Sequence, residues 1–345
     1  MKKTYLKIIF LALILFLPGA LRAEGDMMLT QHWAMPTLLN PAATGDIDFI
    51  RIRGGARMQY FGSHQSPKNY LATADMPFKI SEKRIGAGIM VNSESFDLFR
   101  NLLIGAQGSY KFKIKQSNLS VGIQIGYYHS KFKGSELVIN NTGTNTPDDT
   151  ENDEDSEGTE DPGENKDPFD LPTQDVSSGK MDLAVGIRYD HPKFHVAIAG
   201  QHLTNSTLKL TAEGESSTDA RYVESKLPAT LYFDVGGNIG INNSLISLQP
   251  SILAATDFKD FTAVVDLRAT YNQRVTFGID YRWNRAAGVM AGLILKDFFI
   301  GYNWEYDYKG HPKGSTGNHE LVIGYQFKRN MGGKSNFSHR SIRIM

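Results

Sequence analysis

Hydrophobic and polar residues alternate along most of the chain from Ile47 to Phe327, whereas helical periodicity is scarcely detectable. The alternation is clearest from Gln273 to Trp283. The apolar set there is Val275, Phe277, Ile279, Tyr281 and Trp283, and the opposite set is Arg274, Thr276, Gly278, Asp280 and Arg282. Because successive side chains of a strand point to opposite faces, the pattern predicts an all-β fold. A soluble sandwich alternates in the same way, so the pattern alone does not identify the surrounding solvent.

The number and length of the alternating segments favour a membrane barrel. Many span ~10 residues or more, enough to cross a bilayer at a tilt, whereas strands of globular proteins average ~5 to 6. Fourteen strands are predicted, an even number as in bacterial outer-membrane barrels with both termini on one side. They lie near 47–60, 70–79, 84–93, 102–114, 118–132, 180–190, 193–203, 228–241, 245–255, 260–271, 273–283, 286–295, 297–307 and 318–328.

The predicted connections alternate between short and long. Tight turns are expected at 81–83, 115–117, 191–192, 242–244 and 296, and longer loops at 61–69, 94–101, 133–179, 204–227 and 308–317. Short periplasmic turns and long external loops are typical of outer-membrane barrels. We therefore predict a transmembrane antiparallel barrel of about 14 strands with both termini in the periplasm. Its lumen is expected to carry Arg51, Arg53 and Arg57, which share the polar face of the first strand.

The two ends of the chain differ from the barrel pattern. Residues 1–23 resemble a secretory signal peptide, with early lysines, an apolar run over 8–17 and a Leu-Arg-Ala cleavage sequence. Beyond that run, no segment is apolar over a length that would span a membrane as a helix. The predicted organisation is a signal peptide at 1–23, a lead-in at 24–46, a barrel at 47–328 with an acidic low-complexity loop at 140–179, and a basic tail at 329–345.

Composition and motifs give little support to catalysis. The chain has no cysteine, which excludes disulfides, thiolate metal sites and a cysteine nucleophile. Basic and acidic residues balance at 37 each, so no overall field favours nucleic acid. The nine histidines are scattered, and no nucleophile elbow, phosphate loop or His-Glu-x-x-His pair occurs. We predict neither catalytic residues nor a cofactor, and a hydrolase would lack an identifiable pair of nucleophile and base.

The acidic loop contains the one metal-binding pattern worth weighing. Asp153, Asp155, Glu157 and Glu164 fall at calcium-loop spacings, and carboxylate oxygens on a flexible turn suit calcium. However, Pro162 interrupts the exit of that loop, and a run this acidic matches the spacing easily. The sequence favours a solvated disordered loop over a calcium site.

Several short motifs resemble one known family. A Gln-aromatic element and a Leu-Asn-Pro-Ala segment ending in glycine follow the predicted signal, and an Arg-x-Gln-aromatic-x-Gly element with a downstream proline ends the first strand. The residues are Gln31, Trp33, Leu39, Asn40, Pro41, Ala42, Gly45, Arg57, Gln59, Gly62 and Pro67. Together with the Gly-x-Gly of the third strand at 86–88, their order resembles the PorP/SprF family of the type IX secretion system. Ser93 departs from the aspartate of many members.

The resemblance implies a non-enzymatic protein of the outer membrane of Bacteroidetes. Members support the secretion or surface anchoring of large proteins that carry a C-terminal signal, including adhesins of gliding motility. The implied partners are outer-membrane lipids, the secreted cargo, and either the periplasmic PorK/PorN ring or a peptidoglycan-binding protein, with no nucleic acid. The alternative function is an outer-membrane porin or hydrophobic-solute channel.

The lead-in segment carries most of the signature. Asn40 precedes proline and is therefore expected to be extended, and Gly45 permits a sharp bend into the first strand. Trp33 and Leu39 are too apolar to remain in water. We expect this segment at the periplasmic mouth or folded partly into the lumen, as a docking surface or plug. A segment that only completes the packing of the barrel is the alternative.

Overall fold

The computed structural model describes residues 28–63, 66–80, 83–137, 171–211, 222–241, 244–310 and 312–328. The predicted signal peptide, the acidic residues up to 170 and the basic tail lie outside these ranges. None of the helices in the described ranges is long and apolar enough to cross a membrane.

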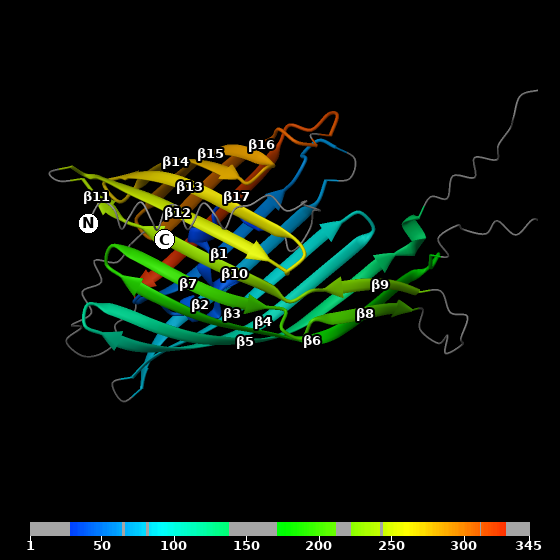
Figure 1. Cartoon of the computed structure of the whole chain (residues 1–345), viewed down its shortest axis with the longest axis horizontal. Coiled ribbons are helices and arrows are strands. Elements are labelled where there is room, and N and C mark those ends of the chain that lie inside the picture. The colour runs from blue at the N-terminus through cyan, green and yellow to red at the C-terminus, as the bar shows by residue number, and fades with distance from the viewer. Residues whose placement is uncertain are drawn as a thin grey trace, which may run out of the picture.

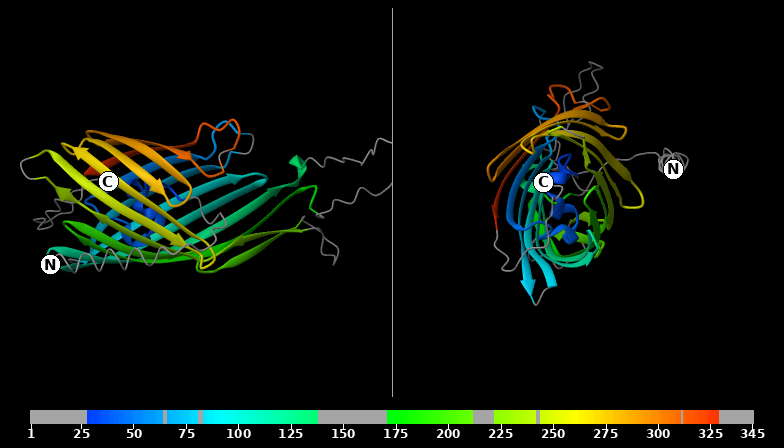
Figure 2. Two further views of the ribbon diagram at one scale, coloured as in Figure 1. Left: turned by 45° about the horizontal axis from the view of Figure 1, so that its top comes forward. Right: turned by 90° about the vertical axis from the view of Figure 1, so that its left-hand side faces the viewer.

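Fourteen antiparallel strands close into a barrel (Figures 1 and 2). They are β1 (Phe49–Met58), β2 (Lys68–Ile80), β3 (Lys83–Phe96), β4 (Phe99–Ile114), β5 (Ser117–Lys133), β6 (Asp175–His191), β7 (Phe194–Gln201), β10 (Thr230–Gly237), β12 (Ile246–Thr256), β13 (Phe261–Tyr271), β14 (Val275–Arg282), β15 (Ala286–Leu295), β16 (Phe298–Asp307) and β17 (Asn318–Lys328). The barrel is closed because β1 pairs with β17 and β10 pairs with β12. After Asn238, the short β11 (Ile239–Gly240) continues the line of β10 along β12.

The two faces of the barrel differ as the alternation predicts. On β14, Phe277 and Ile279 are 64% and 60% exposed on the outside, whereas Thr276, Asp280 and Arg282 are buried on the inside. Large apolar side chains repeat on the outer face of nearly every strand, and polar or charged side chains repeat in the lumen. An apolar outer surface around a polar lumen is the arrangement of a barrel in lipid. Arg51, Arg53 and Arg57 are buried in the lumen, as predicted.

The face assignment predicts a specific sensitivity on β14. Replacing Ile279 by arginine should destabilise the inserted barrel by about 2–4 kcal/mol, because a cation would face lipid near mid-strand. The same replacement at Phe258, which is 80% exposed in the turn between β12 and β13, should cost much less. Heat-modifiable gel mobility and thermal unfolding would measure both variants. Equal effects would show that the lipid-facing side has been assigned wrongly.

All fourteen predicted strands are confirmed, but several predicted loop ranges contain strand residues, most of them in the ranges 133–179 and 204–227. β6 already begins at Asp175, within the predicted acidic loop, and β8 (Ser206–Thr211) pairs with β9 (Tyr222–Leu227) where a loop was expected. This hairpin forms because Leu210 and Val223 pack against Phe132 and Val176 at the ends of β5 and β6. The elongated strands and the hairpin together project beyond the rest of the barrel (Figure 1).

Candidate functional site

Residues 28–46, here called the lumen segment, lie inside the barrel. The segment contains three short helical turns, η1 (His32–Ala34), α2 (Pro36–Leu39) and η2 (Pro41–Ala43), and the end-on view of Figure 2 shows them within the ring of strands. Thr30, Gln31, Ala42, Ala43 and Thr44 have no exposed surface. The lumen of the described barrel is therefore occupied by the chain's own N-terminal part.

The local shape of the lumen segment follows from its prolines, its asparagine and its glycine. Pro36 and Pro41 each stand at the first position of a helical turn, where a missing N–H is tolerated. Asn40 between them is extended, as predicted, and its side chain caps the second turn by accepting from the Ala42 N–H at 2.8 Å. Gly45 has φ +62°, a left-handed conformation that favours glycine and turns the chain towards β1.

The lumen segment crosses most of the barrel, so of the two expected positions it has the one in the lumen and is not confined to the rim where β1 begins. The Thr30 and Gln31 N–H groups donate to the two carboxylate oxygens of Glu320, at 2.9 and 2.7 Å. Glu320 stands near the start of β17 and pairs in register with Arg57 near the end of β1. The segment therefore runs from the loop end of the lumen to the turn end, where Asp46 leads into β1.

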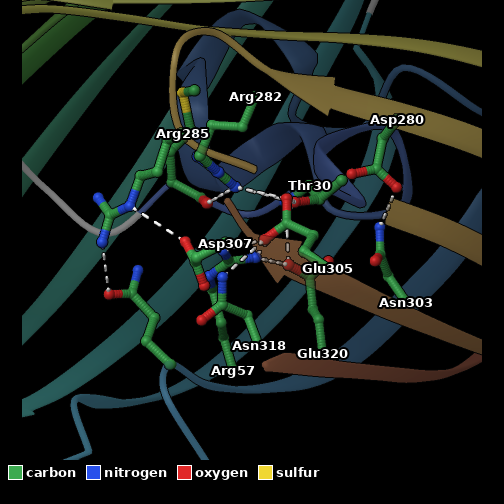
Figure 3. A network of polar contacts seen from close by, with 12 residues as sticks. Thr30, Arg57, Asp280, Arg282, Arg285, Asn303, Glu305, Asp307, Asn318 and Glu320 are labelled. Carbon is green, nitrogen blue, oxygen red and sulfur yellow. Dashed lines mark hydrogen bonds and ion pairs between the residues drawn. The ribbon is translucent and has the colours of Figure 1, made fainter. Parts of the chain in front are cut away.

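A buried polar network holds the loop end of the segment (Figure 3). The Thr30 hydroxyl donates to Glu305 at 2.6 Å and accepts from Arg57 at 3.1 Å and from Arg282 at 2.8 Å. Arg57 also forms ion pairs with Glu305 and, at 2.9 Å, with Glu320. The charges of the network all come from the barrel wall, and the lumen segment contributes a hydroxyl group and main-chain atoms.

The middle of the lumen segment combines aromatic and apolar contacts. The Arg268 guanidinium lies 4.5 Å from the centre of the Trp33 ring, and Phe299 meets the same ring edge-on at 5.6 Å. Met35 and Leu38 join a buried apolar cluster with lumen-facing side chains of the barrel wall. This burial explains why apolar residues of the lead-in segment do not remain in water.

The turn end of the segment packs against a part of the barrel wall where glycines leave no side chain in the lumen. A Cβ atom added at Gly122 on β5 would lie 2.3 Å from the Pro41 carbonyl carbon and from the Ala42 nitrogen. At Gly186 on β6, the added atom would lie 2.0 Å from the Asn40 side-chain oxygen. Only glycine permits so close an approach of one backbone to another. The Asn40 amide then donates to main-chain carbonyls of β6 and β7, each at 3.2 Å.

The glycine pattern of the third strand has the same physical reason. A Cβ atom at Gly86 would lie 2.0 Å from the Thr44 carbonyl oxygen, and one at Gly88 would lie 3.0 Å from the Thr44 methyl group. Next to them, Asp75 accepts from the Gly45 N–H at 2.7 Å and binds Arg51 through both of its oxygens. The bend at Gly45 is thus fixed from two strands.

The signature residues separate into two places in the fold. Gln31, Trp33, Leu39, Asn40, Pro41, Ala42 and Gly45 belong to the lumen segment, and Arg57 binds it from β1. Gln59, Gly62 and Pro67 instead shape the loop after β1: Gln59 donates from its main chain to Pro67 at 2.9 Å, and Gly62 has φ +95°. Among the described residues, no hydrogen bond joins this second group to the segment.

The calcium candidates Asp153, Asp155, Glu157 and Glu164 lie outside the described residues. Within the part of the chain that the structure describes, no group of three or more acidic or histidine side chains is arranged to hold a metal. Sequence reasoning missed the carboxylates and amides that receive the segment, chiefly Glu305, Glu320, Gln107 and Gln201. Their only signal in the sequence is their position on the polar face of a strand.

Comparison with known proteins gives distant structural likenesses and one family. The toluene transporter TbuX of Ralstonia pickettii is 13% identical, with 85% of this chain and 93% of that chain covered and a TM-score of 0.46. A FadL homologue of Pseudomonas aeruginosa is also 13% identical, with coverages of 84% and 92% and a TM-score of 0.47. These values are too low to bear on function, and the comparison with curated protein sequences finds no match.

The family comparison agrees with the motifs described above. The model of the type IX secretion system membrane protein PorP/SprF matches residues 21–325, nearly the whole length of the chain. A closed barrel of fourteen strands with an apolar outer face fits a membrane protein of that kind and is typical of the bacterial outer membrane. The chain is therefore an outer-membrane β-barrel that belongs to the PorP/SprF family of type IX secretion system membrane proteins.

Proposed function

We propose that this protein is a non-enzymatic component of the type IX secretion system that supports the secretion or surface anchoring of large proteins such as adhesins. The observation that carries the proposal, beyond family membership, is the filled lumen. A porin or hydrophobic-solute channel needs a continuous path for its solute, whereas here residues 28–46 bind the wall from the loop end to the turn end. A barrel closed in this way suits a role in binding proteins better than passive transport.

The decisive experiment compares protein export with solute uptake in a strain that lacks the gene. We expect surface and secreted proteins that carry the C-terminal signal to fall, as measured by quantitative proteomics, while uptake of small polar and hydrophobic solutes is unchanged. Complementation with the intact gene should restore export. Normal export together with impaired uptake would overturn the proposal in favour of the channel.

We propose that the turn end of the barrel binds a periplasmic protein, either the PorK/PorN ring or a peptidoglycan-binding component. The charge of the side chains exposed at this end supports the proposal. Basic side chains are exposed on or next to most of the turns at this end, and Asp297 is the exposed acidic residue beside them among the described residues. The basic positions are Lys79, Lys83, Lys113, Lys115, Lys193, Arg274, Lys296 and Lys328. A rim of one sign attracts an acidic partner surface and repels a basic one.

Charge reversal at neighbouring turns tests this docking surface. Lys115→Glu combined with Lys193→Glu should reduce co-purification of the periplasmic partner by roughly 10-fold at low salt, because two attractive charges become repulsive. The matched control is Lys259→Glu with Lys313→Glu, two exposed lysines in connections at the loop end. If both pairs of substitutions weakened co-purification equally, the turn end would not be the docking surface.

A further inference from the structure

The barrel wall binds the lumen segment mainly through the main-chain atoms of the segment. Glu320 and Asp75 accept from main-chain N–H groups of the segment, and the donors of the wall bind main-chain carbonyl groups. These donations are Arg282 to Met28 at 3.1 Å, Gln107 to Thr37 at 2.7 Å, Gln201 to Leu38 at 2.6 Å and to Leu39 at 2.8 Å, Arg51 to Ala43 at 3.3 Å, and Ser109 to Thr44 at 2.6 Å. Hydrogen bonds to a main chain do not depend on side-chain identity. The side chains of Thr30, Asn40 and Thr44 add further hydrogen bonds to the wall.

Three buried polar side-chain atoms of the segment lack a hydrogen-bond partner. Trp33 Nε1, Gln31 Oε1 and Thr37 Oγ1 are buried without a hydrogen-bond partner among the described protein atoms. A sequence selected only to fill this lumen permanently would be expected to satisfy or remove such groups, because each one costs free energy. The wall therefore binds the backbone along the segment but leaves these three side-chain atoms unpaired.

Several buried charges of the wall pair with one another and not with the lumen segment. From Met28 to Gly45 the segment contains no aspartate, glutamate, lysine or arginine. The buried charges pair with one another across the strands, as in Arg57 with Glu320 at 2.9 Å and Arg268 with Asp266 at 2.7 Å. Departure of residues 28–45 leaves these two pairs intact and removes His32, which lies 3.6 Å from Asp234 and 3.9 Å from Asp266. The ion pair of Asp46 with Arg51 at 3.0 Å anchors the end of the segment that joins β1. The occupied lumen is thus compatible with exchange of its occupant.

We propose that the lumen is a binding site for a stretch of a partner polypeptide that lacks acidic and basic side chains, and that the lumen segment is a resident substitute for that ligand. The site crosses the barrel, with carboxylates and arginines at the loop end and glycines at the turn end. The backbone of the ligand can lie as close to Gly122 as Pro41 and Ala42 of the segment do, and Gly186 leaves room for an amide side chain such as that of Asn40. This inference rests on the proposed function, because a protein of the secretion pathway supplies the partner chain.

The test uses the full-length barrel in detergent and a fluorescent synthetic peptide with the sequence of residues 28–45. Thr30→Ala with Asn40→Ala loosens the resident segment but leaves the side chains of the wall intact. Peptide binding to this variant should be saturable and at least ~10-fold tighter than to the wild type, because the competing segment holds less firmly. Adding Gln201→Ala should weaken peptide binding by roughly 10-fold, since two hydrogen bonds to main-chain carbonyls are lost.

A cysteine introduced at Thr37 reports directly on release, because the chain has no other cysteine. Thr37 is 1% exposed, and its hydroxyl makes no bond that the substitution would remove. Thr37→Cys should react slowly with a maleimide in the otherwise unchanged protein and much faster in the loosened variant. Two outcomes would overturn the inference. In the first, the introduced thiol of the loosened barrel reacts but the barrel binds no peptide. In the second, the loosened barrel is folded and its introduced thiol stays protected. Both readouts use purified protein, so they are independent of whether export fails in the deletion strain.

Discussion

Replacing Arg57 by methionine should lower the free energy of unfolding of the barrel by about 3–5 kcal/mol, the usual cost of removing one partner from a buried ion pair. Arg57 is 1% exposed and binds both Glu305 and Glu320, which are equally buried. Methionine fills similar space but leaves two carboxylates, of which only Glu305 retains an arginine, Arg282 at 3.3 Å. Chemical or thermal unfolding of the purified protein would measure the loss.

Two comparisons separate the charge effect from a general effect of losing arginine. Arg274→Met, at an exposed position in a turn, should change stability by less than about 1 kcal/mol. Adding Glu320→Gln to Arg57→Met should recover part of the loss, because the unpaired carboxylate is then neutral. If Arg57→Met were no worse than Arg274→Met, the network of Figure 3 would not stabilise the barrel.

The barrel could be predicted from the sequence because its pattern is local. Lipid outside and polar atoms inside impose a strict period of two on every strand, so segments such as 275–282 are recognisable without their neighbours. The hairpin of β8 and β9 escaped prediction for the opposite reason. Its strands are short, and Leu210 and Val223 are buried by packing against Phe132 and Val176, which belong to strands distant in the sequence.

Of the functional site, the sequence predicted the lumen segment but not the residues of the barrel wall that bind it. The lead-in segment stood out by its apolar residues and by the bend-forming Asn40, Pro41 and Gly45, and a place in or near the lumen followed. Its partners could not be inferred, since Gln31 and Glu320 bind each other across 289 positions of sequence. The glycines of the wall were visible as part of a motif, but their purpose depends on a backbone that approaches them in the folded barrel.

Replacing Gly122 by valine should expel the lumen segment and open the barrel. The added side chain would collide with the backbone at Pro41 and Ala42, which cannot move aside as a flexible side chain would. Overpacking of this kind costs about 3 kcal/mol, which shifts the ratio of seated to released segment by roughly 150-fold. Valine itself suits a strand, so β5 should still form. In planar lipid bilayers, the wild type should remain closed and the variant should conduct ions.

The matched control for this prediction is Gly108→Val on the adjacent strand β4. A Cβ atom at Gly108 meets nothing within 4 Å, so valine there adds the same side chain without touching the lumen segment. Both variants should keep the heat-modifiable gel mobility of a folded barrel, and only Gly122→Val should conduct. A folded Gly122→Val barrel that stays closed would mean that the segment can seat itself elsewhere in the lumen. Conduction by both variants would mean that closure does not depend on contact between the segment and β5.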